Sequence, residues 1–240
     1  VELDVSFIGD TQDRSGNDRA VTVADDVVVD TGGAHFDGQS DFITVASFDY
    51  YSDESFTIMF WMTQEACTGG IYEYLYSHSH DRMAEIDDVT NSNVNMYLGC
   101  EDSGGGWSTT EGTVIRYNLV DSAQTWAMFD YPLHDAGDFV AVTNLWVHVA
   151  LIVSADRLTT FADGRPVSDD EYGFYTGGGV MEASNVAYPH PNTLTTGFVG
   201  FAMEEDIYLG GRADLNADRH FVGTIAGVIV SANDLTVDQV

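Results

Sequence analysis

The sequence predicts an all-β fold, an antiparallel two-sheet jelly-roll sandwich with long inserted loops. Short stretches rich in β-branched and aromatic residues alternate with Gly, Asp, Asn and Ser, long helical periodicity is absent, and 44% of the 240 residues are hydrophobic. Many evenly spread strands of this kind are typical of sandwiches and jelly rolls. The length and the hydrophobic share suit one domain over residues 1–240 with a full core.

Strand signals follow one another along most of the chain. Short runs of β-forming residues between turn residues favour strands over helices. We expect strands at 27–29, 42–45, 56–62, 71–76, 94–98, 113–119, 125–129, 139–142, 146–153, 158–162, 198–202, 207–209 and 221–230. The best candidate for a helix is a single turn at 235–238.

Turns and two long loops separate these strands. Residues 154–157 indicate a hairpin turn, and Asp163-Gly164 indicates the next tight turn, in which Gly takes a positive φ. Segments 101–112 and 168–196 each contain three consecutive glycines and are predicted loops. Long loops in a compact sandwich often carry function, so we expect the recognition site there.

The charge balance is strongly acidic. Eight basic residues, all of them Arg, stand against 39 acidic ones, which gives a net charge of −31. Such a chain repels phosphate backbones and anionic lipids, and no run is apolar enough to span a bilayer, so we expect neither nucleic-acid binding nor membrane insertion. The acidity has two explanations, a solvated surface suited to a saline environment and a surface that binds divalent cations. We favour the solvated surface, with one or two calcium sites within it.

The two cysteines, Cys67 and Cys100, each follow a predicted strand. If those strands are neighbours, a disulfide between them is feasible and would indicate an oxidising compartment. The alternative is two separate small core residues, and sequence alone does not decide the pairing. No signal peptide is visible, as in a mature or trimmed chain.

Five short motifs occur in an order that resembles one known superfamily. They are Asp13-Arg14-Ser15-Gly16-Asn17; Phe36-Asp37-Gly38 with Asp41-Phe42-Ile43; the strand 56–61; Trp146-Val147-His148-Val149-Ala150 with Phe161-Ala162-Asp163-Gly164-Arg165; and Leu209-Gly210-Gly211 with the strand 221–225. In this order they resemble the laminin-G-like, or concanavalin-A-like, lectin and glucanase superfamily. The match runs from residue 13 to residue 236, with insertions at 65–135 and 168–196.

The resemblance implies a fold and a range of functions. The superfamily fold is a jelly roll of two antiparallel sheets, and its members mostly bind sugars or proteins, often with a structural calcium ion. The fold does not fix the function, so the sites need their own argument. One departure concerns Ala226, which stands where the family usually has an Asp that helps to hold calcium or to cap a turn. A calcium site built from the N-terminal turn and that position is therefore less expected.

Two Asp-rich segments are candidate calcium sites. Calcium takes roughly six to eight oxygen ligands, which turns dense in Asp and Asn can supply. The candidate ligands are Asp10, Asp13, Asn17 and Asp18 in the first segment and Asp214, Asn216 and Asp218 in the second. The alternative for the first segment is an Asx-turn with solvated carboxylates. The second begins like a calcium loop, but Arg219 and Ile225 replace the Gly and the acid of a full EF-hand.

A hydrolase would need a pair of acids. Some glucanases of the superfamily carry Glu-x-Asp-x-x-Glu on a strand, and Glu85-Ile86-Asp87-Asp88 resembles its beginning. Retaining hydrolysis needs two carboxyl groups about 5 Å apart, and the final acid would fall at Val89 or Thr90, which cannot transfer a proton. We therefore expect no catalysis. The segment His78-Ser79-His80-Asp81 offers too few ligands for a metal site, which favours a polar strand end.

Aromatic residues in loops favour sugar binding, because the apolar faces of sugars stack on rings while Asp and Asn bind hydroxyls. The candidate ligand-binding residues are Trp107, Asp102, Trp126 and Tyr131. Trp61 and Trp146 lie in apolar strand patterns and are predicted to belong to the core.

These observations lead to one functional prediction and two alternatives. We predict an extracellular or cell-surface recognition and adhesion module, not an enzyme, that binds a glycan or an extracellular protein with calcium support. The first alternative is a self-assembling structural subunit of an extracellular filament, sheath or appendage. The second alternative is a glucanase-like glycoside hydrolase.

Overall fold

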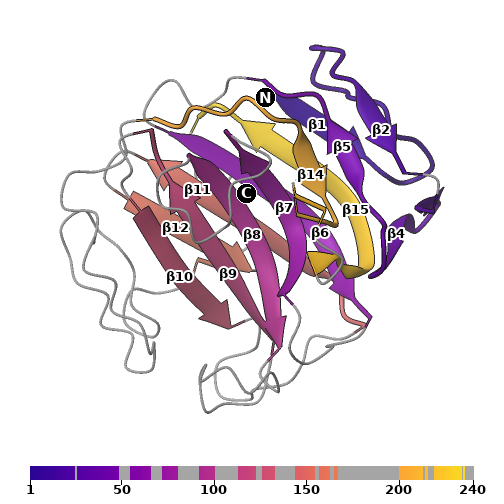
Figure 1. Ribbon diagram of the computed structural model, residues 1–240. Helices are drawn as coiled ribbons and strands as arrows, with labels where there is room; N and C mark the ends of the chain where they lie inside the picture. Colours follow the sequence, from indigo (N-terminus) through magenta and orange to yellow (C-terminus); the bar gives the residue numbers. More distant parts are fainter. Residues whose placement is uncertain are drawn as a thin grey trace.

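The computed structural model is a sandwich of two antiparallel β-sheets that lie face to face (Figure 1). It describes residues 1–24, 26–48, 55–65, 72–80, 92–100, 113–122, 126–132, 144–154, 157–162, 165–166, 200–212, 214–215, 219–233 and 235. For residues 100, 113–114, 126–132, 154, 157–162 and 165–166 only the backbone is described. The architecture confirms the predicted antiparallel two-sheet jelly-roll sandwich.

The first sheet, sheet A, has the strand order β13-β12-β11-β6-β15-β4-β3, and β1 also pairs with β15. Its strands are β1 (Leu3–Ser6), β3 (Val28–Asp30), β4 (Gly33–Asp37), β6 (Phe56–Gln64), β11 (Val147–Ser154), β12 (Arg157–Ala162), β13 (Arg165–Pro166) and β15 (Val222–Ser231). Strands β11 to β13, and β3 and β4, pair with their neighbours in the sequence, whereas the centre of the sheet is held by long-range pairing of β6 with β11 and of β15 with β6, β4 and β1.

The second sheet, sheet B, has the strand order β10-β9-β8-β7-β14-β5-β2. Its strands are β2 (Val21–Val23), β5 (Ile43–Val45), β7 (Tyr72–Ser79), β8 (Asn93–Cys100), β9 (Thr113–Val120), β10 (Trp126–Pro132) and β14 (Ile207–Leu209). Strands β7 to β10 follow one another as a meander, in which each strand pairs with the next.

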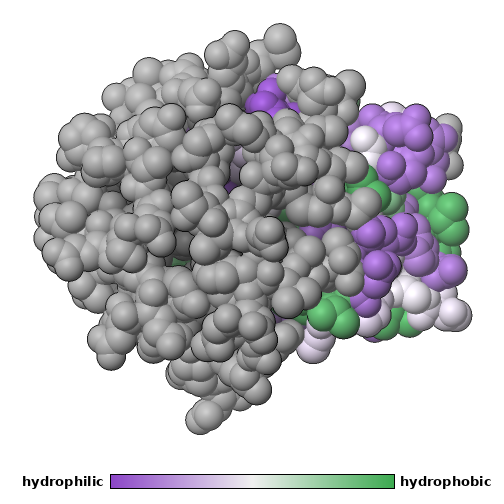
Figure 2. Space-filling view, turned by 90° about the horizontal axis from the view of Figure 1, so that it is seen from below, coloured by the Kyte–Doolittle hydropathy of each residue, from purple (hydrophilic) through white to green (hydrophobic). Residues whose placement is uncertain are grey.

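The core lies between the two sheets and is built by the alternation of strand residues. On β6, Ile58, Phe60 and Met62 point inward and are buried, whereas Trp61 points outward and is exposed. The facing strands of sheet B contribute Val94, Met96, Leu98, Ile115, Tyr117 and Leu119. The described surface visible in Figure 2 is mostly hydrophilic, with separate hydrophobic spots, as the acidic composition leads one to expect.

Strand β15 lies at the centre of sheet A and changes partner along its length. It pairs with β6 on one side throughout, and on the other side Val222–Ile225 pairs with β4 while Gly227–Val230 pairs with β1. The register shifts between Ile225 and Gly227, so Ala226 occupies a β-bulge, and its carbonyl accepts a hydrogen bond from the Phe7 N–H at 2.8 Å. Ala226, noted above as a departure from the family pattern, thus marks the change of partner.

Most predicted strands occur, with shifts of one to three residues at their ends. One prediction was wrong: residues 200–202, from the predicted strand 198–202, are not in a strand. Strands β1, β2 and β4 were not predicted, and 139–142 and most of 235–238 lie outside the described residues. In the described part of the chain, no helix has the length and apolar character needed to cross a membrane.

Candidate functional site

The outer face of sheet A carries an aromatic platform, formed by Trp61, Trp146 and His148. Trp61 on β6 lies opposite His148 on β11, and the two ring centroids are 5.0 Å apart at an angle of 43°. Trp146 is the residue immediately before β11 and precedes His148 by two residues, so we infer from the alternation of the strand that it lies on the same face. His148 is buried, whereas Trp61 is 48% and Trp146 45% exposed. The prediction that both tryptophans belong to the core was therefore wrong.

The neighbouring strand leaves the Trp61 ring uncovered. On β15 the residue opposite Trp61 is Gly227, which has no side chain to lie against the indole. A Cβ on Gly227 would lie 3.0 Å from the Val5 carbonyl oxygen, so the close approach of β1 favours glycine here. Packing between two strands thus leaves a large aromatic surface in contact with solvent.

Farther along the same face, apolar side chains are covered. Met59, Ala150 and Ile152 form a second buried cluster, against which Ile229 and Leu235 pack. Leu235 comes from the segment that follows β15. The outer face of sheet A is therefore closed at this end and open at the aromatic platform.

The outer face of sheet B carries buried polar side chains. In the register, Ser77, Asn95 and Asn118 lie side by side on β7, β8 and β9. The Ser77 hydroxyl donates to Asn95 Oδ1 at 2.8 Å, and the Asn95 amide donates to Asn93 Oδ1 at 3.0 Å. These four side chains are buried although they face away from the core, and their hydrogen bonds lower the cost of that burial.

At one end of this face, three arginines and three tyrosines form an arginine–tyrosine cluster. Its members are Tyr72, Tyr74, Tyr97, Arg116, Arg212 and Arg219. The Tyr74 and Tyr97 rings are stacked with centroids 4.6 Å apart, and Tyr72 meets Tyr97 edge-on at 5.3 Å. The guanidinium carbons of Arg116 and Arg212 lie 5.9 Å from the Tyr97 and Tyr74 ring centroids, and that of Arg219 lies 4.7 Å from Tyr72. All three distances lie within the limit of about 6 Å that is typical of cation–π contacts.

Charge within this cluster is partly compensated. Arg212 donates from Nε to Asp214 Oδ1 at 2.6 Å, and a second nitrogen of its guanidinium donates to Asp214 Oδ2. Burial lowers the pKa of Arg212, but the hydrogen bonds with Asp214 and the nearby Tyr74 outweigh it, so the net direction is upward and the group stays charged. Burial, followed by the nearby Tyr97, raises the pKa of the Tyr74 hydroxyl well above 10, which keeps it neutral.

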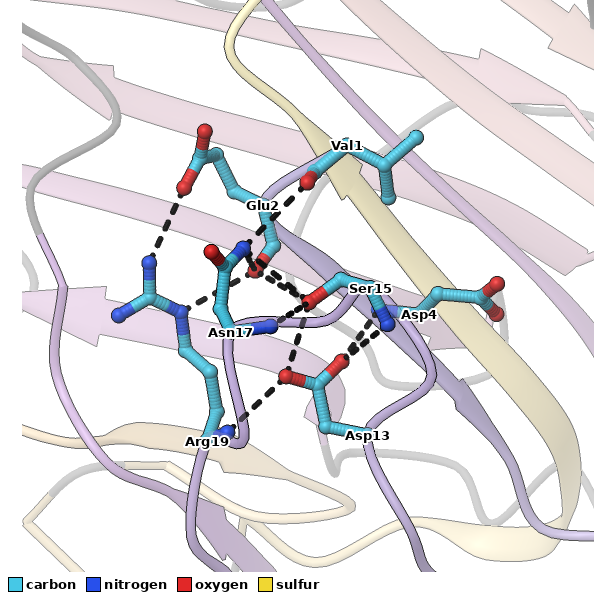
Figure 3. A network of polar contacts seen from close by, with 7 residues as sticks. All are labelled: Val1, Glu2, Asp4, Asp13, Ser15, Asn17 and Arg19. Carbon is cyan, nitrogen blue, oxygen red and sulfur yellow. Dashed lines mark hydrogen bonds and ion pairs between the residues drawn. The ribbon is translucent and has the colours of Figure 1, made fainter.

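The first predicted calcium segment forms a closed hydrogen-bonded turn (Figure 3). Asp13 Oδ1 accepts from the backbone N–H groups of Asp4 at 3.1 Å and Ser15 at 2.9 Å. Asp13 Oδ2 accepts from the Ser15 hydroxyl at 2.9 Å and the Arg19 N–H at 3.0 Å. Burial would raise the pKa of Asp13, but these hydrogen bonds hold it below its ordinary value. The turn thus satisfies the carboxylate with protein donors.

The other candidate ligands of this segment have separate roles. The Asn17 amide donates to the Glu2 carbonyl at 3.0 Å, and Arg19 binds the same carbonyl at 3.1 Å and the Glu2 carboxylate at 3.0 Å. Asp10 pairs with Arg14 at 2.7 Å on the surface, and Asp18 is exposed with a φ of 50°. Asp13, Asn17 and Arg19 therefore anchor the N-terminal strand, whereas Asp10 and Asp18 lie on the surface. Calcium binding at this segment stays a prediction.

In the second segment, Asp214 binds Arg212, while Asn216 and Asp218 lie outside the described residues. Among the residues that the structure describes, no group of three or more His, Cys, Asp and Glu side chains is placed to hold a metal ion. Calcium binding at 214–218 stays a prediction.

The predicted sugar-binding residues and the disulfide are not tested. Trp107, Asp102 and Cys67, like the hydrolase motif at 85–88, lie outside the described residues. Trp126 and Tyr131 are placed by backbone alone on β10, opposite Val120 and Ile115, and Cys100 by backbone alone at the end of β8. The aromatic platform and the arginine–tyrosine cluster are sites that sequence reasoning missed.

The fold defines the class of protein as an antiparallel two-sheet β-sandwich. No family model and no curated protein matches the chain. Among solved structures, the chain is similar to the binding domain of botulinum neurotoxin serotype D, with a TM-score of 0.64 and 15% identity over 99% of this chain and 49% of that one.

Two further solved structures show the same likeness. One is the serotype D ligand-binding domain in complex with N-acetylneuraminic acid, with a TM-score of 0.64, 15% identity and coverage of 99% of this chain and 48% of that one. The other is the serotype G binding domain, with a TM-score of 0.59, 13% identity and coverage of 98% and 48%. The chain therefore spans about half the length of these structures. At this identity the likeness confirms the two-sheet sandwich, and the laminin-G-like family stays a prediction.

Proposed function

We propose that this protein is a non-catalytic glycan-recognition module. The observation that carries the proposal is the aromatic platform, in which two tryptophans are nearly half exposed beside a buried histidine. Leaving such large apolar surfaces in water is unfavourable, and a sugar ring can cover them by stacking its C–H face on the indoles. Because Trp61 and His148 stand on paired strands, these two rings are held in place before the ligand arrives.

The comparisons support this proposal at the level of the fold. A structure with the same sandwich contains N-acetylneuraminic acid, so the architecture occurs in proteins that bind sugars. A fold hosts many functions, which is why the proposal rests on the platform of this chain. We propose an extracellular or cell-surface setting as well, because glycans are displayed there.

The proposal predicts that glycan binding depends on the indole rings. Binding of the wild-type protein to an array of neutral and acidic glycans should be weakened about fivefold or more by Trp61→Ala and by Trp146→Ala, since stacking of one ring contributes about 1 kcal/mol or more. The matched control is Leu145→Ala, because Leu145 is 58% exposed beside the platform but offers no ring. If both tryptophan variants bound glycans as the parent does, the proposal would be wrong.

A second candidate function has one specific observation in its favour. Leu145, Trp146 and Trp61 are all large, apolar and about half exposed, as in surfaces that bind another protein or a second copy. Light scattering after size exclusion, with electron microscopy, tests self-assembly into a filament or sheath. A protein contact needs apolar area, so Leu145→Ala should weaken assembly, whereas glycan stacking should be insensitive to it.

A further inference from the structure

The distribution of arginines is uneven and points to a second site. Three of the eight arginines of a chain with 39 acidic residues meet in the arginine–tyrosine cluster. Elsewhere in the described residues, arginines pair with carboxylates, as Arg14 does with Asp10 and Arg19 with Glu2. In a protein with so many carboxylates, an arginine can readily find an acidic partner. An arginine that has no such partner is therefore unusual.

Arg219 is such an arginine. Its Nε is buried and has no hydrogen-bond partner, and within the described part of the chain no carboxylate pairs with its guanidinium. The contact that holds it is the Tyr72 ring at 4.7 Å. A buried donor without an acceptor costs about 1–3 kcal/mol, and more where the group is charged. Because the residue as a whole is only partly buried, an anion from outside the chain can approach the side chain and balance its charge.

The outer face of sheet B is open at one position near Arg219. On β8 the residue opposite Tyr72 is Gly99, and it lies on the same outer face as Tyr97. A Cβ placed on Gly99 would meet no atom within 4 Å, so open space extends from the sheet at this point. The partly exposed Tyr72 ring borders this space, and the Arg219 guanidinium lies over that ring. A positive group and an aromatic surface therefore adjoin one opening.

We propose that this opening binds an acidic saccharide, with its carboxylate or sulfate group on Arg219 and its ring against Tyr72. The guanidinium fork matches the two oxygens of such a group better than an ammonium group does. The proposal goes beyond the aromatic platform of sheet A. Only the saccharide nature of the ligand rests on the proposed glycan-recognition function, whereas the anion site rests on Arg219, Tyr72 and Gly99.

The net charge limits the ligand to one that is small or sparsely charged. A protein with a charge of −31 repels polyanions over long distances, but salt at about 0.15 M screens interactions beyond about 8 Å. A single acidic group reaches Arg219 through a short-range contact, which is screened less. We therefore expect binding that persists or increases from 0.05 to 0.5 M NaCl, unlike the salt-weakened binding of a basic protein to a polyanion.

Isothermal titration with four probes tests the proposal. The probes are N-acetylneuraminic acid, methyl glucuronide, methyl glucoside 6-sulfate and the neutral methyl glucoside. At least one acidic probe should bind wild type at least tenfold more tightly than the neutral one. That difference should disappear in Arg219→Gln and be restored in part in Arg219→Lys. Arg14→Gln, at an exposed arginine in the N-terminal turn, is the matched control and should bind as wild type does.

A second variant tests the open space without removing a charge. In Gly99→Leu the new side chain has room at its Cβ, so the fold should be kept, as a thermal melt would check, while the opening is filled. Acidic-sugar binding should then fall at least tenfold although Arg219 is present. If a folded Gly99→Leu protein bound as wild type does, the location would be wrong.

The remaining outcomes separate this inference from the proposed function. Loss of neutral-glycan binding in Trp61→Ala together with equal acidic-sugar binding by Arg219→Gln would overturn the anion site alone. Inorganic sulfate bound as tightly as the acidic sugars would overturn the saccharide assignment. Acidic-sugar binding that depends on Arg219 but not on Trp61 would support two separate sites.

Discussion

At the scale of single residues, the interior contains a histidine that burial keeps neutral. His78 on β7 points between the sheets, where its Nε2 lies 2.9 Å from the Glu205 carbonyl oxygen and 3.3 Å from the Ser47 hydroxyl. Burial lowers the pKa of His78 to about 3, and the hydrogen bond to Glu205 offsets this only in part. The neutral ring is thus part of the folded state, whereas the unfolded chain binds a proton near pH 6.5.

This difference predicts a loss of stability on acidification. The folded pKa is lower than the unfolded one, so the contribution of His78 is fully present above pH 6.5 and is lost as the pH falls towards 3. Between pH 7 and pH 5 the loss should be about 2 kcal/mol in the free energy of unfolding. Urea unfolding at both pH values measures it.

The variant His78→Gln should lose less stability over this interval than the wild type, because its amide does not titrate. His35→Gln is the matched control, since His35 is a partly exposed histidine on β4 and its removal leaves His78 in place. A pH dependence in His78→Gln equal to that of the wild type would contradict the assignment.

Residue patterns alone could not predict the aromatic platform. On β6 the outward-facing Met59 and Trp61 are as apolar as the inward-facing Phe60 and Met62, so the alternation that marks an exposed face is hidden. Met59 is covered by the segment near Leu235, whereas Trp61 is bordered by Gly227. Whether an outward-facing residue of β6 is exposed depends on its neighbours from elsewhere in the sequence, and only the three-dimensional structure shows these neighbours.

At the scale of elements, the N-terminal turn acts as a clasp for β1. The Asp13 carboxylate accepts hydrogen bonds from the backbone N–H groups of Asp4, Ser15 and Arg19 (Figure 3). The side chains of Asn17 and Arg19 donate to the Glu2 carbonyl. The side chain of Arg19 also lies over the Phe48 ring at 3.8 Å. The polar residues of this turn thus hold β1 in sheet A. This strand has only four residues and, among the described strands, pairs with β15 alone.

We expect Asp13→Ala to destabilise the fold by about 2–4 kcal/mol, because four part-buried donors lose their acceptor at once. Urea unfolding at pH 7 measures the change. Asp10→Ala is the control in the same turn, since the Asp10–Arg14 pair lies on the surface, and it should leave the unfolding midpoint almost unchanged. An unchanged midpoint in Asp13→Ala would contradict the anchoring role, whereas a midpoint that calcium raises only in the wild type would support the predicted calcium site.

Many of the strands and turns could be predicted from the sequence. The Asp-x-Ser-Gly-Asn motif indicated this turn, and the predicted strands 42–45 and 146–153 correspond to β5 and β11. Strands such as β2 were missed because three residues of mixed polarity, Val21–Val23, show no distinct period. The arginine–tyrosine cluster was missed because its members come from β7, β8, β9 and the segment after β14, which are adjacent only in the folded sheet.

At the scale of the whole molecule, the dominant feature is repulsion among carboxylates. With 39 acidic and eight basic residues, most surface carboxylates have no cationic neighbour to offset them. Self-repulsion of this size opposes the compact state, and salt screens it, with a Debye length that falls from about 14 Å near 0.05 M to about 3 Å at 1 M. The fold should therefore be more stable in concentrated salt.

We expect the melting temperature to rise by roughly 4–8 °C between 0.05 and 1 M KCl, which corresponds to about 2 kcal/mol for a chain of this size. Calorimetry measures it. A variant with Asp18→Asn, Glu65→Gln and Glu204→Gln, all at exposed positions, should melt higher at low salt and show a smaller rise. A rise that is the same in both proteins would show that salt acts by another route than screening.

The central position of β15 has a consequence for how the chain acquires its structure. Because β15 pairs with β6, β4 and β1, sheet A has a gap in its middle until the residues near 231 have been synthesised. Until then strands β1, β4 and β6 have unpaired backbone edges, and such edges favour association with other chains. Formation of sheet A is therefore a late, cooperative event dominated by distant pairings, which makes it slow compared with local structure. A ribosome-bound chain that stops before residue 222 should hold the β7–β10 meander as its most complete unit and should depend on chaperones for its remaining strands.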